Sequence, residues 1–320
     1  MPDSTRHDHG RAVWTALFVT VLWSSSWVLI RIVLDDEDLA PVTFAGLRYT
    51  LAALVLLGWT ASRPAHRRQL ASLDRSVVKR LVVLGVVFFG VTQGAQFVAI
   101  DSQPAATASL MLSLTAFAVA VFSVRSLGER SSARQFLGAA LVAVGAIVYF
   151  SGDLGATAVG LVASFVGLAA NVAGSILGRS VNRDHALHPV IVTTVSMGTG
   201  ALVLLVTGLV IEGWPTVTIT AGVIIGWLAV VNTAVAFTLW NKSLRHLSAV
   251  ESAAINNTML VQIAALGWIF LNEPPGALGG IGVLVVSLGV FLTQPTTSRR
   301  SRHEPVPAPQ DSDPAKPPIR

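Results

Sequence analysis

The chain of 320 residues contains no cysteine, and only 12% of its residues are charged. The absence of cysteine excludes a disulfide framework and thiolate metal sites. The charged fraction is about half of the roughly 25% typical of soluble proteins, whereas 52% of the residues are hydrophobic and the mean hydropathy is +0.66. A soluble core cannot use so much apolar sequence, so the composition predicts an integral membrane protein.

Motifs of membrane enzymes and ATP-driven pumps are also missing from the sequence. It has no glycine-rich loop ending in Gly-Lys-Ser/Thr, no His-Glu-x-x-His and no His-x-x-x-Asp. We therefore predict neither an enzyme nor a cofactor or metal site. An integral-membrane enzyme acting on a lipid-linked substrate and a channel remain the alternatives to a transporter.

Long apolar runs fill most of the chain, and most are 18 to 23 residues long. At 1.5 Å per residue, that length crosses roughly 30 Å of hydrocarbon. We therefore expect an all-α integral membrane protein with ten transmembrane helices. The ten runs lie at about residues 12–33, 41–61, 78–99, 104–124, 133–151, 155–178, 189–211, 217–240, 249–271 and 276–293.

The basic residues predict how these helices are oriented, because Lys and Arg are retained on the cytoplasmic side of a membrane. With the N-terminus inside, 20 of the 22 basic residues fall in the cytoplasm, and Arg31 and Arg48 are the exceptions. Both termini should therefore lie in the cytoplasm, with the chain in a bacterial cytoplasmic membrane. The net charge of +5 follows from this topology and does not indicate a nucleic-acid partner.

The two halves of the chain resemble each other, and five spans in each half would make the second copy inverted, as in many transporters. Leu127–Glu129 recurs 144 positions later as Leu271–Glu273, and near the start of each half the offset is 148. Aligned pairs include Gly138 with Gly282, Gly145 with Gly289, and Arg31 with Arg179. The predicted units are a cytoplasmic segment 1–11, two five-helix repeats 12–151 and 152–294, and a proline-rich, disordered cytoplasmic tail 295–320.

Two acidic residues of the repeat, Glu129 and Glu273, each stand where a helix is expected to begin. A carboxylate there accepts free backbone N–H groups and faces the positive helix end, and Pro274 suits a first turn. We predict that both are helix caps, while a gating or coupling role remains the alternative.

Arg48 is the one basic residue well inside a predicted span, roughly 10 Å below Pro41. Such a residue normally faces protein or a water-filled cavity. It either reaches toward the acidic run 35–38 or packs structurally, or it contacts an anionic substrate group. Its counterpart in the second half is Ser196, so a charge contact would be asymmetric.

Neutral polar residues and two deep tryptophans are the candidates for a substrate cavity. Several of them are spaced three or four residues apart, which places their side chains on one helix face. Interhelical hydrogen bonds or simple packing are the structural alternative for each. The candidates are Trp23, Trp27, Gln93, Gln96, Ser109, Ser113, Asn171, Asn232, Asn256, Asn257 and Gln262.

An ionisable group within the membrane is the usual requirement for proton coupling. The acidic candidate is Glu251, near the cytoplasmic start of a span, and all histidines lie in tails or cytoplasmic connections. Glu251 is either an interfacial residue paired with Lys242, Arg245 or water, or a substrate or proton site that acts as a gate opposite Arg48. Facilitated flux is favoured over proton antiport, although protons stay candidate partners.

Three segments resemble the EamA-type members of the drug/metabolite transporter superfamily. They are Trp23–Trp27, Pro41–Tyr49 with Ala45-Gly46-Leu47-Arg48-Tyr49, and Leu127-Gly128-Glu129-Arg130 before a glycine-rich span. Ser24 departs from this pattern, because a glycine is usual there.

The resemblance covers about residues 12–293 and implies a ten-helix inverted-repeat carrier. Its central cavity would be lined mainly by spans one, three, four, six, eight and nine. We expect a secondary transporter, and an exporter, of a small polar metabolite such as an amino acid. It would work by alternating access as a monomer or homodimer in a lipid bilayer.

Overall fold

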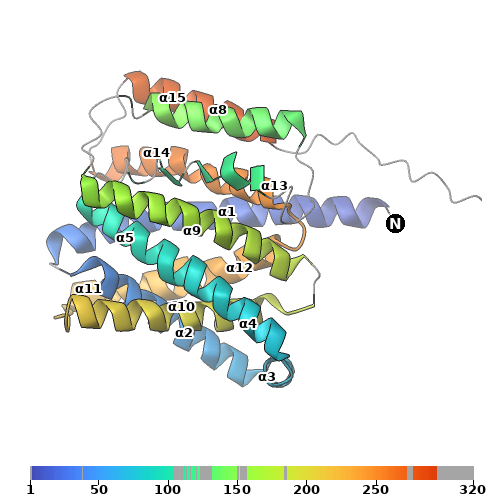
Figure 1. The fold of residues 1–320 in the computed structure, drawn as a ribbon, viewed down its shortest axis with the longest axis vertical. Helices are drawn as coiled ribbons and strands as arrows, with labels where there is room; N and C mark the ends of the chain where they lie inside the picture. Colours follow the sequence, from blue (N-terminus) through green and yellow to red (C-terminus); the bar gives the residue numbers. More distant parts are fainter. Residues whose placement is uncertain are drawn as a thin grey trace, which may run out of the picture.

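A computed structural model gives the fold of the chain (Figure 1). It describes residues 2–37, 39–103, 108, 111–112, 114–115, 117–119, 121–122, 132–149, 151, 157–183, 186–271 and 277–293.

All regular elements of this described part are helices, and they largely follow the predicted apolar runs. The first half contains α1 (Pro2–Asp36), α2 (Pro41–Ser62), α3 (Pro64–Ala71), α4 (Arg75–Leu84), the π-helix η1 (Gly85–Val91), α5 (Thr92–Ser102) and α8 (Ala133–Tyr149). The second half contains α9 (Ala158–Asn182), α10 (Pro189–Ile211), α11 (Ile219–Ala229), the π-helix η2 (Val230–Val235), α12 (Ala236–Ser243), α13 (Ala249–Asn257), α14 (Met259–Leu271) and α15 (Ala277–Thr293).

Seven helical stretches of the described residues are long and apolar enough to cross a membrane. They are Asp8–Leu34, Pro41–Ser62, Arg75–Ser102, Ala158–Asn182, Pro189–Ile211, Ile219–Ser243 and Ala249–Phe270. Two shorter apolar helices, Ala133–Val148 and Ala277–Gly289, match two further predicted runs. Most of the predicted run 104–124 lies outside the described residues. Helix α1 begins at Pro2, about ten residues before the predicted span, because the polar residues that continue it give no apolar signal.

Helix starts follow local chemistry at several spans. Pro41 and Pro189 occupy the first turns of α2 and α10, where a missing backbone N–H costs nothing. The carboxylate of Glu212 accepts hydrogen bonds from the backbone N–H groups of Val42 (3.1 Å) and Thr43 (2.6 Å). The end of α10 therefore caps the start of α2, so the two helices are fixed to each other at this end.

Several helices approach each other so closely that only glycine fits between their backbones. Helix α2 packs on α10, where a Cβ atom on Gly46 would lie 2.7 Å from Cα of Leu205. Helix α8 packs on α15, side by side in Figure 1. A Cβ on Gly145 would lie 2.9 Å from the carbonyl oxygen of Gly282, and one on Gly289 would lie 2.7 Å from that of Gly138. Small residues permit such approach in membranes, where van der Waals contact drives helix association.

Three spans depart from regular α-helix near their middles. Both η1 and η2 are π-helical turns, which are rare and frequent at functional sites. At each, a threonine hydroxyl donates to the carbonyl oxygen five residues earlier, Thr92 to Val87 (3.0 Å) and Thr233 to Leu228 (2.8 Å). The third span breaks at Thr258, between α13 and α14.

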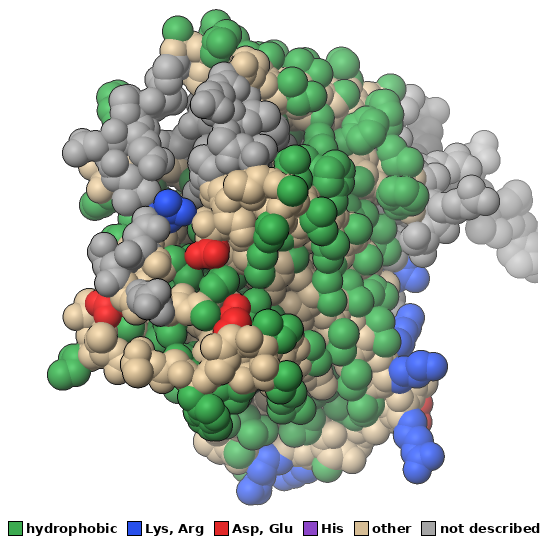
Figure 2. Space-filling model, turned by 60° about the vertical axis from the view of Figure 1, so that its left-hand side comes forward, with side chains coloured by type: hydrophobic (Ala, Val, Ile, Leu, Met, Phe, Trp, Pro, Cys, Tyr) green, Lys and Arg blue, Asp and Glu red, His purple; other side chains and the backbone are tan. Residues whose placement is uncertain are grey.

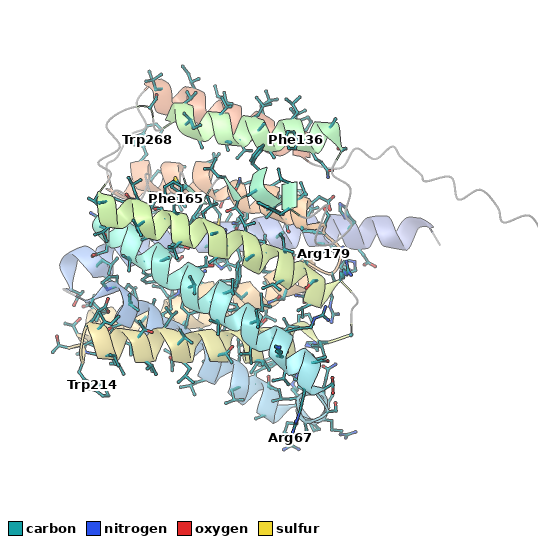
Figure 3. The ribbon with its side chains drawn as sticks, in the orientation of Figure 1. Arg67, Phe136, Phe165, Arg179, Trp214 and Trp268 are labelled. Atoms are coloured by element: carbon teal, nitrogen blue, oxygen red, sulfur yellow. The ribbon has the colours of Figure 1, made fainter. Side chains whose placement is uncertain are left out.

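The surface separates charge from apolar side chains. In Figure 2 most visible Lys and Arg side chains lie at the right and lower edges, most of the acidic ones lie toward the left, and hydrophobic side chains cover the area between. Figure 3 shows Arg67 and Arg179 toward one end of the helices and Trp214 toward the other. Exposed aromatic residues on the helix sides, such as Phe165 (60% exposed) and Trp268 (57% exposed), suit contact with lipid.

Candidate functional site

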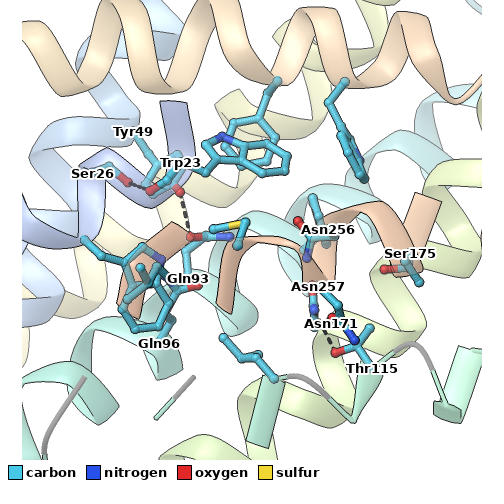
Figure 4. A pocket seen from close by; sticks show the side chains of 18 of the residues that line it. Trp23, Ser26, Tyr49, Gln93, Gln96, Thr115, Asn171, Ser175, Asn256 and Asn257 are labelled. Carbon is cyan, nitrogen blue, oxygen red and sulfur yellow. Dashed lines mark hydrogen bonds between the residues drawn. The ribbon is translucent and has the colours of Figure 1, made fainter. Parts of the chain in front are cut away.

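A cavity of about 90 Å³ lies among the middles of the spans and combines an aromatic wall with amides and one arginine (Figure 4). Residues of α1, α2, η1, α5, α9, α12, α13 and α14 line it, together with two described residues between α5 and α8. The lining residues are Trp23, Ser26, Trp27, Arg48, Tyr49, Phe88, Gln93, Gln96, Leu112, Thr115, Asn171, Ser175, Phe237, Trp240, Ala253, Asn256, Asn257, Met259 and Ile263.

Eight residues proposed from the sequence meet in this cavity. They are Trp23, Trp27, Arg48, Gln93, Gln96, Asn171, Asn256 and Asn257. Four further candidates, Ser109, Ser113, Glu129 and Glu273, lie outside the described residues.

One wall of the cavity is built from aromatic rings contributed by both halves of the chain. The ring centroid of Trp23 lies 4.7 Å from that of Phe237 and 5.0 Å from that of Trp240. The indole N–H of Trp23 donates to the backbone carbonyl of Asn232 at 3.1 Å. This bond fixes the indole, so α1 presents its ring to the cavity while the polar edge is satisfied within the protein.

A tyrosine that the sequence analysis did not select holds one of the predicted amides. The hydroxyl of Tyr49 donates to Oε1 of Gln93 at 2.7 Å, across α2 and α5 (Figure 4). Tyr49 is only 1% exposed, and its ring packs 6.0 Å from Phe89. Two features of the sequence could have indicated Tyr49: it directly follows the intramembrane Arg48, and the chain has only two tyrosines.

Arg48 is buried with 2% of its surface exposed, although it carries a charge. Its Nε–H donates to the hydroxyl of Thr233 in η2 at 2.8 Å, and its guanidinium carbon lies 5.4 Å from the ring centroid of Tyr49. Within the described part of the chain, no carboxylate forms an ion pair with it. A buried charge without a counter-charge costs several kcal/mol. The ring and the hydroxyl offset only part of that cost, so this end of the cavity favours an anion.

Asparagine side chains from α9 and α13 also line the cavity. Asn171 on α9 donates to the hydroxyl of Thr115 at 3.1 Å (Figure 4). Asn256 and Asn257 come at the end of α13, directly before the break at Thr258. Oδ1 of Asn256 is buried and has no hydrogen-bond partner among the described residues. The break therefore delivers to the cavity an acceptor that the described residues leave unsatisfied.

Two predicted cavity residues serve as links between helices instead of lining the cavity. Asn232 has no exposed surface and donates to the carbonyl of Leu22 and to the hydroxyl of Ser25 (3.1 Å).

Gln262 accepts from Ser24 (2.8 Å) and donates to Thr20 (3.1 Å) and Thr258 (3.2 Å). Its amide is used by the protein itself, which joins α14 to α1. We call Gln262, Ser24, Thr20 and Thr258 the α1–α14 network.

Glu251 lies outside the set of cavity residues and closes a capping box at the start of α13. Its carboxylate accepts from the backbone N–H of Ser248 at 2.8 Å, and the Ser248 hydroxyl accepts from the N–H of Glu251 at 3.2 Å. Nε2 of His9 on α1 lies 3.8 Å from the carboxylate. The structure thus places a helix cap at this position, next to the polar extension of α1.

The cavity residues that the sequence analysis did not select are mostly apolar or hydroxyl side chains. Their types occur throughout the spans, so no spacing distinguished them from packing residues. They are Ser26, Tyr49, Phe88, Leu112, Thr115, Ser175, Phe237, Trp240, Ala253, Met259 and Ile263.

A histidine pair lies away from the cavity, where α10 begins. The rings of His66 and His188 have centroids 4.5 Å apart, and Nδ1 of His188 accepts from the backbone N–H of Val190 at 3.3 Å. Burial, and to a smaller extent electrostatic repulsion from the neighbouring side chains of His66, Arg245 and Lys242, lower the pKa of His188 below its usual value. The neutral ring is therefore the form that caps α10.

The sequence of the chain is similar to those of several bacterial proteins whose names describe transporters. The chain is 26% identical over 301 residues to the "Probable terminal-alkyne amino-acid exporter" of Streptantibioticus cattleyicolor, covering 93% of this chain and 98% of that protein. It is 26% identical over 289 residues to the "Probable amino-acid metabolite efflux pump" of Escherichia coli K12, covering 87% and 92%. It is 25% identical over 292 residues to the "S-adenosylmethionine/S-adenosylhomocysteine transporter" of Chlamydia trachomatis serovar D, covering 86% and 87%.

A solved crystal structure shares the fold, with a TM-score of 0.72 at 15% identity over 88% of this chain and 96% of that chain. The model of the EamA-like transporter family matches twice, over residues 10–151 and 155–294. These two matches span most of the chain, including every helix that lines the cavity. The chain belongs to the EamA-like transporter family.

Proposed function

We propose that this membrane transporter exports a small polar metabolite, an amino acid or a similar solute, across the bacterial cytoplasmic membrane by alternating access. The observation that carries the proposal is the central cavity, which both family segments line with aromatic, amide and arginine side chains. Such a cavity near the middle of the spans is where secondary transporters bind solute. The names of the relatives support export and a metabolite substrate.

We further propose ten spans in two inverted repeats, residues 12–151 and 152–294, with segment 1–11 and tail 295–320 in the cytoplasm. The double family match supports this division. The contacts between α8 and α15 support the inversion. Gly145 faces Gly282 while Gly289 faces Gly138, so the contact is reciprocal between aligned positions, as a twofold axis requires.

Two arginines provide independent support for the repeat. Nη1 of Arg31 donates to the carbonyl of Ile100 at 3.0 Å, and Nη1 of Arg179 donates to the carbonyl of Leu244 at 2.6 Å. These pairs are separated by 148 and 144 positions, which are the two offsets of the sequence repeat. The π-helical segments begin 145 positions apart, at Gly85 and Val230.

The irregular segments suit the proposed conformational change. Around the cavity, η1, η2 and the break at Thr258 interrupt three spans where the two repeats would rock against each other. Trp23, Trp27, Gln93, Gln96, Asn171 and Asn257 would form the solute contacts, with Arg48 and Glu251 as charged groups toward opposite sides. A π-helical turn or a helix break lowers the cost of bending, because its backbone bonds are already rearranged.

Flux measurements in proteoliposomes test the proposal. We would measure uptake and efflux of a labelled panel of amino acids, nucleosides and polyamines, with and without an imposed pH gradient. Saturable flux of at least one solute, above that of empty liposomes, is expected. Flux without the gradient would support facilitated transport, and dependence on it would support proton coupling. No saturable flux of any solute in either condition would overturn the proposal.

A further inference from the structure

We propose that Arg48 binds the carboxylate of the transported solute and that Thr233, in the π-helical segment η2, positions its guanidinium group for this task. This inference rests on the proposed function. It adds a specificity-determining residue and a positioning residue, and it gives the solute an orientation in the cavity.

The charge of Arg48 is not balanced by any side chain in the described part of the chain. Arg48 is the one charged side chain among the described residues that line the cavity, and it is 2% exposed. Within that described part no carboxylate pairs with it. A buried cation needs a counter-charge, and a guanidinium group matches a carboxylate in shape and hydrogen bonding. The solute is therefore the natural source of that counter-charge.

Hydrogen bonds orient the guanidinium group of Arg48. Nε of Arg48 is committed to the hydroxyl of Thr233 at 2.8 Å, which leaves the two Nη groups of the fork for a ligand. The hydroxyl proton of Thr233 is itself committed to the carbonyl of Leu228 at 2.8 Å, the bond that accompanies the π-helical turn. Thr233 therefore accepts from Arg48 in a fixed direction. Through this bond, a residue of the second family segment orients the arginine of the first.

The rest of the cavity suits the other end of a zwitterionic solute. Oδ1 of Asn256 is a buried acceptor without a donor among the described residues, and an ammonium group would satisfy it. The aromatic wall of Trp23, Phe237 and Trp240 lines the same cavity and would pack against an apolar solute body. We therefore choose L-leucine as the test solute.

The first experiment compares L-leucine with L-leucinamide, which keeps the ammonium group and side chain but lacks the carboxylate. In proteoliposomes, labelled leucine flux is measured while either unlabelled compound competes. For the wild-type protein we expect leucinamide to compete at least about 10-fold more weakly than leucine, the factor that one charge-assisted hydrogen bond supplies. In Arg48→Gln that preference should fall to about 1-fold, and Arg48→Lys should restore part of it.

The second experiment tests the positioning role of Thr233 with three variants. Thr233→Val keeps the shape but removes the hydroxyl, and it should raise the KM for leucine about 3- to 10-fold while the maximal rate changes little. Thr233→Ser keeps the hydroxyl and should restore the KM. Thr92→Val removes the corresponding hydroxyl bond at η1, which is made to Val87 and not to Arg48, and should leave the preference for leucine over leucinamide unchanged.

The outcomes separate this inference from the proposed function. If leucinamide competes as well as leucine in the wild-type protein, or if inserted Arg48→Gln keeps the preference, the role of Arg48 is overturned. If Thr233→Val equals the wild-type protein, its positioning role is overturned. If leucine is not transported but a nucleoside or polyamine is, the inference falls and the transport function stands. If no solute is transported, both fall.

Discussion

Two polar clusters of this protein look alike in sequence and differ in how their hydrogen bonds are used. In the α1–α14 network, both ends of the Gln262 amide are bonded to hydroxyl groups of the protein. In the cavity, Oδ1 of Asn256 has no partner among the described residues, and Arg48 has no counter-charge there. A satisfied cluster stabilises the fold, whereas an unsatisfied acceptor that lines a cavity can receive a hydrogen bond from a ligand. The difference predicts opposite effects of mutation.

The largest effect is expected on transport, from the cavity amides. Replacing Gln93 or Asn257 by Ala should lower the transport rate at low solute concentration roughly 10-fold, since one buried hydrogen bond of about 1.5 kcal/mol corresponds to that factor. The amount of membrane-inserted protein should not change. Flux in proteoliposomes and size-exclusion profiles of the solubilised variants would check both statements. Unchanged transport in both variants would remove these residues from the site.

The α1–α14 network should show the reverse behaviour. Gln262→Ala removes three hydrogen bonds, each worth about 0.6 kcal/mol on average within a membrane, so the free energy of unfolding should fall by about 1–2 kcal/mol. The KM for the transported solute should stay as in the wild-type protein. Thermal unfolding in detergent and flux kinetics would test this. A raised KM with unchanged stability would place Gln262 in the site and erase the contrast between the clusters.

Glu251 is an ionisable group whose hydrogen bonds, like those of Gln262, are used within the protein. Its carboxylate is used by a capping box, so Glu251→Gln should behave like the wild-type protein because Gln also completes such a box. Glu251→Ala should lower the free energy of unfolding by about 1 kcal/mol. Loss of flux in the Gln variant, together with dependence on a pH gradient, would instead assign the residue to proton coupling. Thermal unfolding and flux of the two variants separate these outcomes.

The smallest effect concerns the histidine pair at the start of α10. Because the pKa of His188 is lowered in the folded protein, the unfolded chain binds more protons as the pH falls below about 6.5. Stability should therefore decrease from about pH 7.5 to about pH 5.5, while the same change above that window has no effect through this group. His188→Asn keeps a capping side chain that does not titrate and should weaken this dependence. An unchanged pH profile of the unfolding temperature in that variant would refute the assignment.

The positions of most helices could be predicted from the sequence, as α2 and α10 illustrate. The boundaries of α2 and α10 follow from Pro41 and Pro189 and from the apolar runs after them. The cavity was predicted only in part. Trp23, Gln93 and Asn171 were identified because polar or deep aromatic residues are unusual within a span. Phe237 and Trp240 were not, because an aromatic residue at a span carries no mark that separates packing from lining.

The π-helical segments were not foreseen either. Gly85–Val91 is apolar, Val230–Val235 has only Asn232 and Thr233 as polar residues, and neither contains proline, so nothing in their composition distinguishes them from α-helix. Close packing accompanies the first of them: a Cβ on Gly85 would lie 2.2 Å from the carbonyl oxygen of Ser196, so η1 and α10 meet backbone to backbone. Thr233 in η2 binds Arg48, a residue 185 positions away in the sequence.

The sequence by itself determined the membrane environment, the positions of most spans and the family, because the bilayer selects apolar length and charge locally along the chain. Only the tertiary structure decided which polar groups face the cavity. Gln93 and Gln262 carry the same amide, and each was an equal candidate in the sequence. Hydroxyl groups bond both ends of the Gln262 amide, whereas Gln93 accepts one bond from Tyr49 and lines the cavity. Such contacts between distant helices exist only in the folded arrangement.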